Sequence, residues 1–112
     1  MKKFLLLYTS PISAEEQMSS ANPREMQKSM EPWMEWFSAV GDGLLDRGMP
    51  LGNPKHVTTS GTTEGKLHVT GYSMIQAESM DKALELAQKQ PHLKMGDGRS
   101  VEVLEVLSMP GM

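Results

Sequence analysis

The run KFLLLYT, residues 3–9, decides the fold that we expect for this chain. It is short, continuous and apolar, which is typical of a strand buried on both faces. The run imitates the start of a secretory signal, but its apolar part, Phe4 to Tyr8, is shorter than the roughly 7–15 residues of a signal core. Polar residues follow it at once, so we interpret it as a first strand. Its alternate side chains would point to opposite faces, Phe4, Leu6 and Tyr8 against Leu5 and Leu7.

Two amphipathic helices and three further strands follow this run. Asn22 and Pro23 are typical of a helix start, and apolar residues then recur at steps of three and four as far as Leu44. Pro32 should kink this helix or split it in two. Ser79 is a typical cap for a second helix, which Pro91 would end. We expect the remaining strands at residues 55–59, 66–77 and 100–107, with a hairpin loop at 60–65.

The expected order is strand, helix, strand, strand, helix, strand. This order predicts an α+β fold of the ferredoxin-like βαββαβ kind, with a four-stranded antiparallel sheet and both helices on one face. The length of 112 residues fits a single domain, residues 1–112, with one hydrophobic core.

Both faces of the expected sheet are apolar, although helices would cover only one. In the third strand Leu67, Val69 and Ile75 oppose His68, Tyr72 and Met74, and in the last strand Val101 and Val103 oppose Leu104 and Val106. A monomer would expose a larger apolar patch than soluble proteins usually carry. We therefore expect a homodimer that packs sheet against sheet about a twofold axis. The alternative is that long connections fold over the open face.

Composition excludes several classes of function. The net charge is −3 and no basic stripe is present, so we expect no nucleic-acid partner. The chain has no cysteine, which excludes disulfides, thiolate metal sites and a cysteine nucleophile and fits a cytoplasmic location. No segment approaches the roughly 20 apolar residues of a membrane span. The three histidines lack metal-ligand spacing, and we expect neither a metal nor a cofactor.

Five segments of the chain resemble the YCII-related, or DGPF-domain, family. They are KFLLLY at 3–8, WMEWF at 33–37, GYSMI at 71–75, PHL at 91–93 and SVEV at 100–103. The resemblance implies a dimeric α/β-barrel built from ferredoxin-like units. The Asp-Gly-Pro-Phe signature is absent, since residues 58–65 read TTSGTTEG, so its role is not transferred to this chain. A His/Asp pair in a cleft is the active site suggested for some relatives, and the resemblance implies His92 as its histidine.

His92 is also the candidate catalytic residue on its own chemistry. It follows Pro91 at the end of the second helix, where the helix dipole favours a protonated imidazole. A histidine that titrates near neutral pH can act as a general acid or base. The alternative is a capping role, in which His92 bonds the last helix carbonyls.

Three further residues are candidates for ligand binding. His68 and Tyr72 would line a pocket on the dimer face, although His68 could equally be a hydrogen-bonded interface histidine. Trp36 lies at the edge of the helix stripe, where it could form the wall of a cleft, whereas Trp33 should belong to the core. The eleven methionines would give an adaptable lining for a hydrophobic ligand or serve as ordinary core filler.

Two classes of function remain open at this point. One is a small-molecule enzyme without a cofactor, in which His92 carries the proton. The other is a non-catalytic dimeric module that binds a hydrophobic small molecule or a protein partner.

Overall fold

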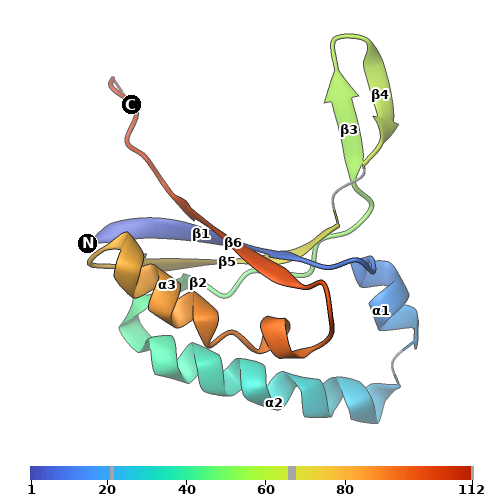
Figure 1. Ribbon diagram of the computed structural model, residues 1–112, viewed down its shortest axis with the longest axis horizontal. Helices are drawn as coiled ribbons and strands as arrows, with labels where there is room; N and C mark the ends of the chain where they lie inside the picture. Colours follow the sequence, from blue (N-terminus) through green and yellow to red (C-terminus); the bar gives the residue numbers. More distant parts are fainter. Residues whose placement is uncertain (21, 66–67, 112) are drawn as a thin grey trace.

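A four-stranded antiparallel sheet forms the centre of the molecule, and two helices cover one of its faces (Figure 1). The computed structural model describes residues 1–20, 22–65 and 68–111. The strands lie side by side in the order β2 (Leu44–Asp46), β5 (Val69–Ala77), β1 (Lys2–Thr9) and β6 (Ser100–Glu105). The covering helices are α2 (Pro23–Val40) and α3 (Met80–Gln88).

Shorter elements join these parts. A helix of two turns, α1 (Ala14–Ser20), leads from β1 to α2, and a 3-10 turn, η1 (Gly41–Gly43), leads from α2 to β2. A second 3-10 turn, η2 (Pro91–Lys94), follows α3. The strands β3 (Lys55–Thr58) and β4 (Gly61–Glu64) form a separate hairpin. No helix in the described parts of the chain is long and apolar enough to cross a membrane.

The alternation predicted for the first strand is confirmed. Phe4, Leu6 and Tyr8 of β1 are buried beneath the helices, while Leu5 and Leu7 on the other face are half-buried. Burying such side chains is the main favourable contribution to folding. The core is completed by residues from β5, α2 and α3, namely Ile75, Ala77, Trp36 and Ala83.

The second strand of the sheet is not the one we predicted. Residues 55–59 were expected there, but Lys55–Thr58 pairs with Gly61–Glu64, within the predicted loop. Only two residues separate β3 from β4, so their pairing closes a very short loop and costs little chain entropy. The strand beside β5 in the sheet is instead β2. It starts at Leu44, the last of the apolar residues that we had assigned to the first helix. Leu44 pairs with Ile75 of β5.

The strand that we expected over residues 66–77 begins at Val69 in the structure, and Lys66 and Leu67 lie outside the described residues. A register shift after Tyr8 places Val69 opposite Thr9. Val69 therefore lies on the face opposite Ile75, and the prediction that the two share a face is wrong. His68 precedes the strand instead of lying in its middle.

Pro32 does not split α2. The helix runs without interruption from Pro23 to Val40, and Asn22 Oδ1 caps it by accepting from the Glu25 backbone N–H at 2.8 Å. Proline removes the hydrogen bond to the carbonyl four residues earlier, on Lys28. Because Lys28 and Pro32 are exposed, water can satisfy that carbonyl.

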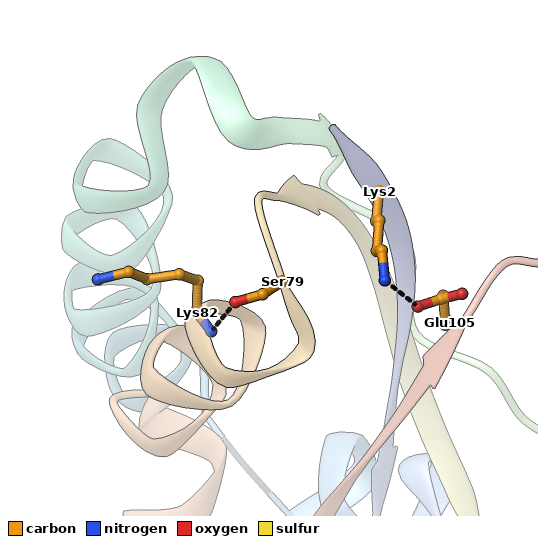
Figure 2. A network of polar contacts seen from close by, with 4 residues as sticks. All are labelled: Lys2, Ser79, Lys82 and Glu105. Carbon is orange, nitrogen blue, oxygen red and sulfur yellow. Dashed lines mark hydrogen bonds and ion pairs between the residues drawn. The ribbon is translucent and has the colours of Figure 1, made fainter.

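Figure 2 shows the cap of α3 beside an ion pair of the sheet. Ser79 Oγ accepts from the Lys82 backbone N–H at 3.2 Å, which confirms the predicted cap. Lys2 Nζ lies 3.5 Å from Glu105 Oε1 and joins β1 to β6. The lysine is exposed, so the ion pair contributes little to the free energy of unfolding.

The face of the sheet away from the helices is left open. Leu5 lies at its centre, opposite Met74 of β5 on one side and Leu104 of β6 on the other. The β3–β4 hairpin and the C-terminal segment both rise on this side of the sheet (Figure 1). All residues of β3 and β4 are exposed, so the hairpin does not pack onto this chain.

Candidate ligand-binding cavity

A cavity of about 440 Å³ lies between α1, α2 and one end of the sheet. Its volume falls within the range of small-molecule sites. The lining comes from α1, α2, β1, β5, the segment 47–50 after β2, and the segment that joins α3 to β6. Elements far apart in sequence therefore meet around one space.

Most of the wall is apolar and soft. Six methionines line it, Met18, Met26, Met30, Met34, Met49 and Met95. Trp33 lies among them. Its ring centroid is 5.2 Å from that of Tyr8, in an edge-to-face contact, and 6.1 Å from that of Phe37. Methionine side chains adapt to irregular shapes, so this wall can accommodate apolar molecules of different outline.

His92 is the titratable imidazole of the cavity. Only 3% of the residue is exposed, and its ring centroid lies 5.4 Å from that of Tyr8. His92 Nε2 donates to the carbonyl oxygen of Thr9 at 2.7 Å. A carbonyl only accepts, so the proton is on Nε2 and the neutral ring has its lone pair on Nδ1.

The predicted surroundings of His92 are wrong. It lies in η2, beyond the end of α3, and it bonds the Thr9 carbonyl instead of the last helix carbonyls. Burial lowers the pKa of His92 below its ordinary value of 6.5, and hydrogen bonding to the Thr9 backbone opposes this change. The positive charge of Arg99 lowers the pKa further. The imidazole is thus held neutral, not protonated as the helix dipole had predicted.

The lowered pKa of His92 predicts a stability loss in mild acid. Below about pH 6.5 the unfolded chain binds a proton at this residue that the folded chain does not. The free energy of unfolding should therefore decrease as the pH is lowered. The loss should end below the folded-state pKa. Urea unfolding at pH 7.5 and pH 5 measures it, and His92→Gln should reduce the difference. An equal difference in His92→Gln and wild type would contradict this assignment.

A buried chain of hydroxyl groups lies behind the cavity. Gln90 Nε2 donates to the Tyr8 hydroxyl at 3.0 Å, Tyr8 donates to Ser73 Oγ at 2.6 Å, and Ser73 donates to the Arg47 carbonyl at 2.7 Å. Burial raises the pKa of Tyr8 to about 12, and its bond to Ser73 opposes the rise only in part. Tyr8 therefore stays protonated and acts as a fixed hydrogen-bond donor.

The structure places only some of the predicted site residues at this cavity. His92 lines it. Tyr72 borders it, but Tyr72 pairs with Leu7, so its side chain shares the open face of the sheet with Met74, and its hydroxyl lies 3.5 Å from Asp46 Oδ2. Trp36 does not line it, because it is buried in the core, where Nε1 donates to the Leu86 carbonyl at 2.9 Å. Trp33 packs against the core, as predicted, and also lines the cavity. His68 is also outside the lining, and its Nδ1 is buried without a hydrogen-bond partner.

Several residues of the site were not found by sequence reasoning. They are Tyr8, Gln90, Arg47 and Arg99. For Tyr8 a signal existed, since the alternation of β1 places its side chain beneath the helices, where a hydroxyl needs a partner. Nothing in the local sequence around the other three marks them, because they are brought together by the long connections of the fold.

Within the described ranges, no group of three or more histidine, aspartate or glutamate side chains is placed to hold a metal ion. No model of a known protein family matches the chain, and no curated protein matches it.

Proposed function

We propose that the protein binds a small, mostly apolar molecule in the cavity and that His92 acts on this molecule as a proton carrier without a cofactor. One observation carries the proposal: a methionine-rich cavity of about 440 Å³ has a neutral, buried imidazole in its wall. An apolar pocket with a few polar groups and a titratable residue of altered pKa is the usual form of a small-molecule site.

The chemistry of His92 fits the acceptance of a proton. Because its pKa is lowered, the imidazole is unprotonated at neutral pH and Nδ1 can take a proton from carbon or oxygen. The bond from Nε2 to the Thr9 carbonyl fixes the tautomer and stabilises the charge that forms on the ring. Tyr8, whose ring packs against that of His92, stays protonated beside it.

A second candidate is a non-catalytic module that binds the same kind of molecule. The observation in its favour is the partner of His92, which is a backbone carbonyl and not a carboxylate. A carboxylate would raise the basicity of the ring more strongly, as in catalytic triads. In this case the cavity binds a ligand and returns it unchanged.

We further propose that the chain has a ferredoxin-like fold, forms a homodimer through its sheet, and belongs to the YCII-related class. The strand order β2-β5-β1-β6, with both long helices on one face, supports the fold. The open apolar face around Leu5 supports the dimer, since a second copy would cover it. The β3–β4 hairpin rises on the same side and would lie against that copy. A lone two-stranded hairpin is marginally stable in water, so such a contact would stabilise it.

Hydrogen exchange at carbon tests the proton-carrier role. A neutral, apolar ketone such as 2-tetralone has acidic C–H groups, and their exchange in D₂O is followed by proton NMR. Wild type should accelerate the exchange, and His92→Gln should lower the rate by roughly 100-fold, the typical contribution of a general base. His56→Gln, a change on the exposed hairpin, is the matched control and should leave the rate unchanged.

The outcomes separate the two candidates. Equal exchange rates for wild type and His92→Gln would contradict the catalytic role. If the ketone binds without any accelerated exchange, the non-catalytic module is the better description. Failure of apolar molecules of this size to bind at all would contradict both.

A further inference from the structure

Two arginines break the apolar lining of the cavity. Arg47 and Arg99 are its charged side chains, and the described lining contains no aspartate or glutamate. The charged side chains of the described lining are therefore all cationic, which favours a ligand of opposite charge. A purely apolar ligand would gain nothing from either guanidinium group.

The position of Arg47 is fixed by the backbone around it. Its carbonyl accepts from Ser73 Oγ at 2.7 Å, and the next residue, Gly48, packs directly against the backbone of β5. Gly48 has φ +80°, and a Cβ there would lie 1.5 Å from the Tyr72 carbonyl oxygen, so only glycine fits. The Arg47 guanidinium lies 5.2 Å from the centroid of the Phe37 ring, which holds it at the cavity wall.

Arg99 approaches the cavity from the segment before β6. Its Nη1 donates to Gln17 Oε1 of α1 at 3.4 Å, and its charge acts on His92. The ion pairs found among the described residues join Lys2 to Glu105, Lys55 to Glu64 and Lys82 to Glu85. Neither arginine takes part in one of these pairs. Both cations can thus receive an anion from outside the chain.

We propose that the ligand of this cavity is an amphipathic organic anion, whose anionic head binds Arg47 and Arg99 while its apolar body packs on Trp33 and the methionines. This inference rests on the proposed function and names its ligand class. Guanidinium groups match carboxylates and related oxyanions in shape and form strong charge-assisted hydrogen bonds with them. Arg47 is exposed and Arg99 half-buried, so the head would lie at the mouth of the cavity and the body inside.

A matched pair of fluorescent probes tests the ligand class. 1-Anilinonaphthalene-8-sulfonate and N-phenyl-1-naphthylamine share one apolar skeleton, and only the first has an anionic group. Wild type should bind the sulfonate at least about 10-fold more tightly. Arg47→Gln and Arg99→Gln should each weaken sulfonate binding by about 5- to 10-fold, the size expected of a partly exposed charged contact. Neither change should alter binding of the neutral probe.

Arg24→Gln is the control, because Arg24 is an arginine of α2 that does not line this cavity. It should leave both probes unaffected. Equal affinities for the two probes, or arginine variants that bind the sulfonate as wild type does, would overturn the ligand class and leave the proposed function standing. Failure of both probes to bind would contradict the proposed function itself, and this inference with it.

Discussion

Replacing Phe4 with alanine should lower the free energy of unfolding by about 3–5 kcal/mol, the cost typical of removing a buried phenylalanine. Phe4 is 0% exposed and lies on β1, between β5 and β6, where its ring packs beneath the helices. The alanine would leave a cavity that the surrounding sheet and helices can fill only in part. Because small domains are stable by only about 5–15 kcal/mol, this change removes a large share of the total.

Urea unfolding followed by circular dichroism measures the effect. Lys3→Ala is the matched control, since Lys3 is the exposed neighbour of Phe4 on the same strand, and it should change stability by less than about 0.5 kcal/mol. A loss below about 1 kcal/mol for Phe4→Ala would mean that the covered face of the sheet has been assigned wrongly.

The second large effect concerns the open face of the sheet. If a second copy covers this face, Leu104→Lys would place a charge in an apolar interface, where it has no partner. We expect the dissociation constant of the dimer to rise at least about 100-fold, which corresponds to about 3 kcal/mol. Sedimentation velocity at several protein concentrations measures the change.

A leucine on the helical side gives the control for this experiment. Leu84 of α3 is 40% exposed and Leu104 is 46% exposed, so the same substitution at the two positions differs mainly in the face that it alters. Leu84→Lys should leave the dimer intact. Dissociation by Leu84→Lys but not by Leu104→Lys would place the interface on the helices, and a wild-type monomer at all concentrations would refute the dimer.

The central strands could be predicted because their side chains carry the signal themselves. In β1, Phe4 and Leu6 alternate with Leu5 and Leu7, and strand period alone assigns their faces. The caps at Asn22 and Ser79 were equally local, since each side chain bonds a backbone group three residues away.

The second strand could not be predicted in this way. β2 has only three residues, Leu44–Asp46, and the apolar pair at its start continues the spacing of the preceding helix. Its place in the sheet is decided by the pairing of Leu44 with Ile75 of β5, a strand that follows the β3–β4 hairpin in the chain. Lys55–Thr58 has strand-forming residues, but they pair within a hairpin, which sequence period cannot distinguish from pairing within the sheet.

The site could be predicted only in part, because tertiary packing again decides the rest. The methionine stripe of α2 follows from helical period, but the exact rotation of the helix does not. An error of one residue turns the helix by about 100°, enough to move Trp36 from the edge of the stripe into the core. For His92, burial is the largest cause of the lowered pKa, and burial of this kind is decided by tertiary packing.

Methyl NMR of the methionines tests the central claim, ligand binding in the cavity, most directly. Six of the eleven methionines line the cavity, whereas Met74 lies on the open face of the sheet and Met109 in the exposed C-terminal segment. With ¹³C-methyl methionine and single Met→Leu variants for assignment, we expect N-phenyl-1-naphthylamine to shift the signals of Met18, Met26, Met30, Met34, Met49 and Met95. The signals of Met74 and Met109 should stay in place. Shifts confined to Met74 would put the ligand on the open face and contradict the account.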